Sequence, residues 1–237
     1  MAQQIVNAPS IRNGPIRASP YLGGMDIASP LAIAIDGPAA SGKGTIARRI
    51  AARRGLRHLD TGLLYRAVAV LCMAEGIALA DDEAAGARAA RLEPADLERA
   101  DLRSAEAGRG ASVVAAHGAV RAALLDWQRA FARVPPGAVL DGRDIGTVVL
   151  PGASAKLFVT ADPDVRAARR WRELSKGRDI AYRDVLHDIE ERDARDAARP
   201  DAPMRRADDA ALLDTTDMTI DQAVAEAERL IAARLGS

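Results

Sequence analysis

Short runs of apolar residues recur along the chain, and segments with helical spacing of their apolar positions separate them. The first run, residues 31–35 (LAIAI), leads through a Gly-rich turn into a helix expected over residues 45–54. Further runs at 56–60, 138–141, 155–161 and 211–216 have the length and composition of buried strands. Because helices separate these five strands, the pattern predicts an α/β fold with a five-stranded parallel sheet covered by helices on both faces.

The helical segments have recognisable ends. One helix is expected over 61–76, stopped by Gly76, and one long helix over 111–134, stopped by Pro135. Arg-rich helices are expected over 162–176 and 182–198, and Thr219 is placed to cap a last helix over 219–235. Residues 80–110 show weak helical periodicity and none of the β-branched alternation of a strand.

The first 30 residues differ from the rest of the chain. They lack helical or strand periodicity and contain four Pro and three Gly. They also lack the continuous apolar stretch of a secretory signal. We therefore expect a disordered N-terminal extension over 1–30, with Met25 as an alternative start, and a folded domain over 31–237.

Composition and charge exclude several classes of protein. The 237 residues carry 33 Lys and Arg against 33 Asp and Glu, with no polybasic block, which argues against a nucleic-acid binder. The longest apolar runs fall well short of the roughly 20 residues that span a bilayer. Cys72 is the single cysteine, so no intrachain disulfide is possible, and no Cys/His cluster has zinc spacing. We expect a monomer in the reducing cytoplasm, with no nucleic-acid or membrane partner.

The strongest chemical signal is a Gly-rich turn that follows a strand and opens a helix, as a phosphate-binding loop must. Its backbone N–H groups and the helix N-terminus attract phosphate, and Lys43 can reach the β and γ phosphates of ATP. Only three lysines accompany thirty arginines, so a lysine here is unlikely to be a generic charge. The expected ATP-binding residues are Gly37, Pro38, Ala39, Ala40, Ser41, Gly42, Lys43, Gly44 and Thr45.

Two further segments carry candidate chemistry. The strand at 138–141 ends in Asp141 and delivers Arg143 and Asp144 to the carboxyl edge of the sheet, where ligands bind in such folds. An arginine run that includes Arg169 and Arg170 opens a segment, about 166–184, with Gly177 as a hinge, that can form a lid over ATP. The chain has no Asn-Lys-x-Asp motif for reading guanine, which argues against a GTPase.

Three motifs together resemble bacterial cytidylate kinases. They are DTGLLYR at 60–66, DGRDIGT at 141–147 and ERDARD at 191–196, and the resemblance runs from about residue 31 to 235. It implies a P-loop kinase fold with a lid and a nucleoside-monophosphate-binding insert. It also implies phosphoryl transfer from ATP to CMP or dCMP, with Mg²⁺ bridging the phosphates.

The resemblance assigns roles residue by residue. It implies Thr61 and Arg66 near the CMP phosphate, Ser112 and Arg121 near the base, and Asp144 at the pyrimidine end of the pocket. It also implies Arg192 and Asp196 at the sugar, with Arg143 and Arg199 in the same basic pocket. The expected catalytic residues are Lys43, Asp141, Arg169 and Arg170, and the hydroxyl of Thr45 is expected to hold Mg²⁺, directly or through water.

The sequence also departs from the family and leaves alternatives. Cytidylate kinases often carry a small sheet in the CMP-binding half, whereas residues 80–110 predict that this insert is reduced. The histidines His58, His117 and His187 are scattered, and we assign them no role. The ATP half alone would also fit a kinase for another small acceptor such as UMP, or a module that binds ATP without transferring phosphate.

Overall fold

The protein folds around a five-stranded parallel sheet. A computed structural model describes residues 30–176 and 179–236. The strands are β1 (Leu31–Asp36), β2 (Arg57–Asp60), β3 (Gly137–Gly142), β4 (Ala155–Thr160) and β5 (Ala211–Asp214), in the order β2-β3-β1-β4-β5. All neighbouring pairs are parallel, which confirms the α/β fold and the five strands that the sequence predicts.

Helices cover both faces of this sheet. On one face α1 (Lys43–Arg54) and α8 (Ile220–Leu235) pack on Ile33, Ile35 and Val139. On the other face α2 (Thr61–Ala74) and α5 (Gly118–Ala132) pack on Ala34 and Leu140. Successive side chains of a strand point to opposite faces, so both faces being covered explains why the strands read as continuous apolar runs.

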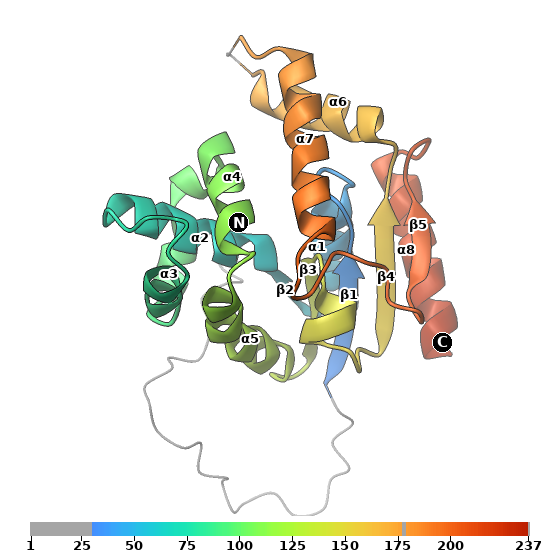
Figure 1. The fold of residues 1–237 in the computed structure, drawn as a ribbon. Coiled ribbons are helices and arrows are strands. Elements are labelled where there is room, and N and C mark those ends of the chain that lie inside the picture. Colours follow the sequence, from blue (N-terminus) through green and yellow to red (C-terminus); the bar gives the residue numbers. More distant parts are fainter. Residues whose placement is uncertain (1–29, 177–178, 237) are drawn as a thin grey trace, which may run out of the picture.

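The chain between β2 and β3 is helical. It contains α2, α3 (Asp82–Ala89), α4 (Ala105–Val114) and α5, with two 3₁₀ turns at Pro94–Glu98 and Ala100–Arg103. Residues 61–136 contain no strand, as the sequence predicts for the reduced insert. These helices form one group at the β2 edge of the sheet (Figure 1).

The single long helix expected over 111–134 is wrong. Residues 105–114 form α4, a turn follows at 115–117, and α5 begins at Gly118. The Nε2 atom of His117 lies 2.7 Å from the carbonyl oxygen of Leu79, and Asp82 accepts a hydrogen bond from the backbone N–H of Ala119. Contacts with the preceding helical segment therefore fix the turn between the two helices.

A helical hairpin projects from the carboxyl end of the sheet (Figure 1). It consists of α6 (Pro163–Leu174) and α7 (Tyr182–Ala197), which pack around Ala167, Val185 and Ile189. The segment expected as a lid, about 166–184, falls within this hairpin, while the expected hinge at Gly177 lies outside the described residues. The expected extension over 1–30 also lies outside them, apart from Pro30.

Candidate functional site

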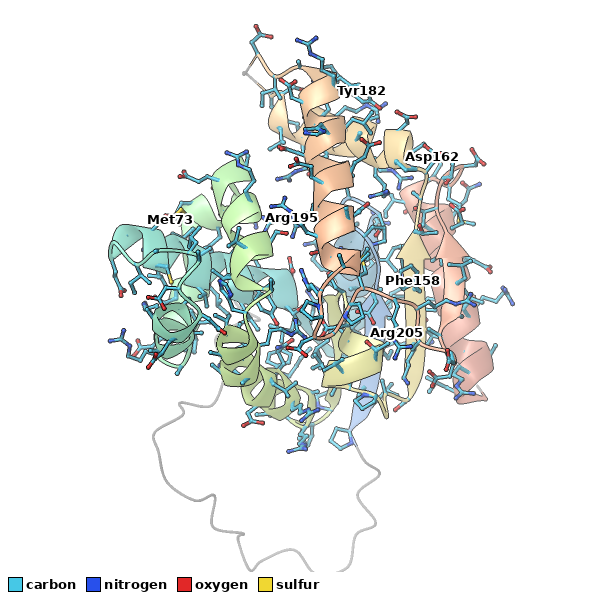
Figure 2. All side chains as sticks on the ribbon, viewed as in Figure 1. Met73, Phe158, Asp162, Tyr182, Arg195 and Arg205 are labelled. Carbon is cyan, nitrogen blue, oxygen red and sulfur yellow. The ribbon has the colours of Figure 1, made fainter. Side chains whose placement is uncertain are left out.

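A cavity of about 570 Å³ opens at the carboxyl ends of the strands. The phosphate-binding loop and the ends of β2 and β3 form its floor, and residues of α2, α4, α6 and α7 form its walls. Arg195 of α7 lines it, and in Figure 2 this residue lies on the side of the hairpin that faces α4. The cavity is thus bounded by α2 and α4 on one side and by the hairpin of α6 and α7 on the other.

The backbone of the phosphate-binding loop is fixed by glycine. Gly37 has a φ of 149°, and a Cβ atom there would lie 1.9 Å from the carbonyl oxygen of Val159 on the neighbouring strand. Gly42, with a φ of 89°, precedes the first turn of α1. Ser41, Gly42, Lys43, Gly44 and Thr45 line the cavity together with Ala39 and Ala40, whereas Gly37 and Pro38 do not line it.

Lys43 is partly buried, and charges of both signs act on its ammonium group. Its Nζ atom donates a hydrogen bond of 3.2 Å to the carbonyl oxygen of Pro38. Burial and the positive charge of Arg143 lower the pKa of Lys43 to about 7, while Asp141 and Asp60 oppose that change. The ammonium group therefore lacks a fixed counter-ion of its own, as suits a group that meets phosphate.

The ends of β2 and β3 place two carboxylates together. Asp60 and Asp141 are partners in the strand register, and burial followed by repulsion from Asp141 raises the pKa of Asp60. Asp60 also caps α2 by accepting a hydrogen bond from the backbone N–H of Gly62, and the Thr61 hydroxyl donates to the carbonyl of Asp141. The Nε2 atom of His58 lies 2.7 Å from Asp141 Oδ1, so assigning no role to His58 overlooked a direct contact with a site residue.

Asp196 organises the arginines on the other side of the cavity. This carboxylate is 1% exposed and contacts Arg143 at 2.8 Å, Arg192 at 3.9 Å, and Arg199. Burial opposes ionisation of Asp196, but Arg143 and Arg199 outweigh it and lower the pKa of this carboxyl. Burial and Arg143 also lower the pKa of Arg192 to about 9. One carboxylate among three guanidinium groups leaves positive charge free for an anionic ligand.

Asp144 and Arg121 form an ion pair between the loop after β3 and helix α5. Asp144 lines the cavity, whereas Arg121 and Ser112 are not among its lining residues. Both of these have a buried polar atom without a hydrogen-bond partner, Arg121 Nη1 and Ser112 Oγ. Such buried atoms are costly unless a ligand or water satisfies them.

Two arginines of α6 line the cavity from the lid side. Arg169 donates to both the hydroxyl and the carbonyl of Thr215, at 3.0 and 2.7 Å, and Arg170 donates to Glu173 at 3.1 Å. On the opposite wall Arg66 donates to the carbonyl of Leu102 at 3.0 Å. These three arginines, which the sequence predicts for the site, line one cavity.

The base of the lid hairpin is tied to the phosphate-binding loop. Arg166 of α6 is 5% exposed and donates to the carbonyls of Ala161 and Ala39 and, at 2.5 Å, to Asp193 of α7. The hydroxyl of Tyr182, the first residue of α7 (labelled in Figure 2), donates to the carbonyl oxygen of Asp164 in α6. One buried guanidinium thus connects both lid helices to the loop.

Comparison with known proteins identifies the family. The family model described as cytidylate kinase matches residues 33–233. The chain belongs to the cytidylate kinase family. It is 62% identical over 206 residues to a cytidylate kinase of Xanthobacter autotrophicus, covering 86% of this chain and 98% of that protein. It is 56% identical over 200 residues to a cytidylate kinase of Caulobacter vibrioides, covering 84% of this chain and 94% of that protein.

A solved structure supports the fold independently. An uncharacterized protein from Eubacterium ventriosum superposes with a TM-score of 0.52 at 14% sequence identity, covering 86% of this chain and 99% of that protein. At this identity the similarity concerns the fold alone. It agrees with the α/β architecture of the cytidylate kinase family.

Sequence reasoning missed several residues that the structure brings to the site. Asp36 ends β1 just before the loop, Tyr65 lines the cavity beside the ion pair of Asp144, and Thr215 donates to the carbonyl of Ser41. Asp36 shares with Asp141 the signal of an acidic residue at the end of a buried strand. Side chains two positions apart on a strand lie on the same face, so His58 shares a face of β2 with Asp60. The two-residue period of the strand was therefore a signal that could have linked His58 to the site.

The residues at the loop fit a hard cation held together with phosphate. Thr45 contributes a hydroxyl at the start of α1 and lines the same cavity as Asp60 and Asp141. Within residues 30–176 and 179–236, no group of three or more His, Cys, Asp or Glu is arranged to hold a metal by itself. Mg²⁺ in kinases is bound by one or two protein oxygens, water and the substrate phosphates, so this donor set suits it.

Proposed function

We propose that this member of the cytidylate kinase family transfers the γ-phosphoryl group of ATP to CMP or dCMP, giving ADP and CDP or dCDP. The observation that carries the proposal is the single cavity in which the phosphate-binding loop faces an arginine-rich subsite built around Asp196. One end suits a polyphosphate and the other suits a second phosphate ester. A reaction between two bound phosphates needs that arrangement.

On the ATP side the loop supplies the positive charge. The N–H groups at the start of α1 and the Lys43 ammonium would hold the β and γ phosphates, and the neighbouring Asp141 would keep the ammonium oriented. Bound Mg²⁺, held by Thr45 directly or through water, would neutralise phosphate charge. Lys43 is therefore proposed to stabilise charge on the transferring group, with Arg169 and Arg170 reaching it from the lid.

On the acceptor side, arginine would bind the phosphate and carboxylates would bind the nucleoside. Thr61, Arg66, Arg143 and Arg199 surround the proposed site of the CMP phosphate, and Arg192 with Asp196 would meet the sugar hydroxyls. Asp144, held by Arg121, would accept a hydrogen bond from the exocyclic amine of cytosine. Ser112, with its unpartnered hydroxyl, would hold another edge of the base.

The lid would exclude water during transfer. The segment at about 166–184 carries Arg169 and Arg170, and α4, which begins at the end of the reduced insert at about 80–110, forms the facing wall. Closing of these two walls would bring the arginines to the phosphates and protect ATP from hydrolysis. Arg166 would hold the base of the lid in place as it moves.

The proposed setting of the enzyme is a monomer in the cytoplasm. All residues proposed for both substrates come from one chain, so the site needs no second subunit. None of the helices in the described part of the chain is long and apolar enough to cross a membrane. The proposed partners are the small molecules ATP and CMP or dCMP, with no nucleic acid.

The alternative acceptors and the non-catalytic module are less favoured. A module that only binds ATP has no use for the arginines around Asp196, and family membership agrees with cytidylate as acceptor. A kinase for UMP would present a donor, rather than the acceptor Asp144, to the position where uracil has a carbonyl.

A coupled assay with ATP, Mg²⁺ and a panel of monophosphates tests this function. We expect CMP and dCMP to give the highest kcat/KM among CMP, dCMP, UMP and AMP. Asp144→Asn should narrow the CMP over UMP ratio by about tenfold or more, because an amide can turn its N–H toward uracil and carries no repulsive charge. UMP or AMP exceeding CMP in the parent enzyme would contradict the proposed function.

A further inference from the structure

Asp36 lies buried at a point where both substrate-binding segments begin. It is the last residue of β1, is 4% exposed, and is followed directly by Gly37 of the phosphate-binding loop. Its Oδ1 accepts a hydrogen bond from the backbone N–H of Ile145 and its Oδ2 one from that of Gly146, both at 2.7 Å. These two amides come directly after Asp144.

This arrangement requires a carboxylate. Two parallel N–H groups need two acceptor oxygens, which an ionised Asp provides and an Asn, with one oxygen and one NH₂ group, does not. Burial raises the pKa of Asp36 to about 7, and the two backbone hydrogen bonds oppose that change. The two backbone N–H donors favour the ionised carboxylate, so this buried side chain is matched to the backbone of the 145–146 segment.

The loop that Asp36 holds has little other freedom. A Cβ atom on Gly146 would lie 3.1 Å from Lys156 Cδ and 3.3 Å from Asp36 Oδ2. These two side chains therefore leave little space for any side chain at Gly146. On its other side Asp144 is paired with Arg121 of α5. Two interactions therefore fix the position of the Asp144 carboxylate. They are its ion pair with Arg121 and the hydrogen bonds of Asp36 to the two backbone N–H groups that follow Asp144.

We infer that Asp36 is a positioning residue for base recognition: its carboxylate fixes the 144–146 backbone and so determines where Asp144 meets the pyrimidine. The inference rests on the proposed function, in which Asp144 reads cytosine. It assigns to the end of β1 a part in acceptor choice, although Asp36 is not among the residues that line the cavity. Asp36 would thus connect the acceptor pocket to the strand that carries the phosphate-binding loop.

Asp36→Asn tests the inference by its pattern of kinetic effects. We expect the KM for CMP to rise about tenfold and the CMP over UMP ratio of kcat/KM to fall at least about fivefold, because the amide repels one loop N–H and displaces Asp144. The KM for ATP should stay within about twofold, since the sheet pairing of Asp36 with Gly142 and Phe158 still holds the strand end.

Two further variants separate positioning from loss of structure. Arg88→Met removes a buried charge among the insert helices, paired with Glu75 and away from the cavity, and should lower the melting temperature without changing the CMP over UMP ratio. Gly146→Ala presses on the same loop while keeping the Asp36 carboxylate, and should lower that ratio even if Asp36→Asn does not fold. Adding more Mg²⁺ or ATP should not restore the CMP over UMP ratio of kcat/KM in Asp36→Asn or Gly146→Ala.

The outcomes distinguish this inference from the proposed function. If the parent does not prefer CMP, the proposed function fails. If the parent prefers CMP and Asp144→Asn narrows that preference, the proposed function stands and Asp36→Asn decides the inference. A CMP over UMP ratio of kcat/KM within twofold of the parent in Asp36→Asn overturns the positioning role of Asp36. Where Asp36→Asn does not fold, the same result in Gly146→Ala overturns it. An equal rise of both KM values would also overturn it, because it would indicate a general disturbance of the site.

Discussion

At the scale of single residues, Lys43 illustrates why this chain uses lysine at the phosphate loop. Thirty arginines supply its other positive charges almost everywhere, but arginine stays protonated in any surroundings. Lysine can lose its proton when buried, and burial together with Arg143 lowers the pKa of Lys43 to about 7. The site can therefore exist without ligand at a smaller electrostatic cost and become charged when phosphate arrives.

Binding of ATP should take up a proton through this residue. The phosphates favour the charged ammonium and raise the pKa of Lys43, so a group that is about half protonated at pH 7 becomes fully protonated. We expect uptake of about half a proton per ATP at pH 7, more at pH 8 and little at pH 6. Calorimetry in buffers of different ionisation enthalpy measures it, and the difference from Lys43→Met isolates the lysine. Equal uptake by parent and variant would contradict the assignment.

Replacing Lys43 should also separate stability from activity. Lys43→Met should lower kcat about a hundredfold or more, the scale for a preorganised charge donor, yet raise the melting temperature without ligand. The folded-state pKa lies below the usual 10.5, so the burial cost is fully present below pH 7 and fades as the pH rises toward 10.5. The gain in melting temperature should follow that window. A variant with kcat within about threefold of the parent would remove the catalytic role.

Single residues also show how far the sequence could predict the site. The phosphate-binding loop was recognisable because its chemistry is contiguous, from Gly37 to Thr45. The contact of His58 with Asp141 joins residues 83 positions apart, and only the pairing of β2 with β3 brings them together. The same holds for Asp36 with Ile145 and Gly146. Local patterns identify groups that act together within a motif, whereas the sheet order decides which motifs meet.

At the scale of elements, the close approach of β1 and β4 makes Gly37 irreplaceable. Gly37→Ala should lower the free energy of unfolding by about 3 kcal/mol or more, because the new Cβ meets the Val159 carbonyl and the φ of 149° is strained for any side chain. Urea unfolding measures this. Gly118→Ala is the matched control, since a Cβ there meets nothing within 4 Å at the start of α5. Similar losses in both variants would contradict the explanation.

The elements also show why strands were easier to predict than helix breaks. Four of the five strands, β1, β3, β4 and β5, are short and mainly apolar, and helices cover both faces of the sheet, whereas β2 (RHLD) contains one apolar residue, Leu59. Across residues 111–134 the apolar face continues through the turn at 115–117, and the helical period gives no sign of it. His117 and Gly118 were the available signals, but the turn is fixed by contacts with Leu79 and Asp82, which lie about 35 residues earlier.

At the scale of the whole molecule, positive and negative charges are unevenly distributed, although the net charge is zero. Exposed ion pairs such as Arg229 with Glu226 balance the surface, while ten Lys and Arg residues line the cavity against six Asp and Glu residues. Surface pairs contribute little to stability, but an enclosed positive cavity attracts anions strongly. The neutral composition that excludes a nucleic-acid binder therefore remains compatible with binding two nucleotides.

The extent of the working domain leads to a last prediction. The family model begins at residue 33, and the relative from Xanthobacter autotrophicus aligns over 98% of its own length while covering 86% of this chain. The site draws all its residues from position 39 onward. A chain that starts at Met25 should therefore keep kcat/KM within about twofold and its melting temperature within about 2 °C of the full chain, because residues 1–24 precede the region that the family model matches. Differential scanning fluorimetry and the coupled CMP assay measure both.

A fall in melting temperature of several degrees with unchanged kinetics would mean that residues 1–24 pack on the folded domain away from the site. A loss of kcat/KM at equal stability would mean that they reach the cavity.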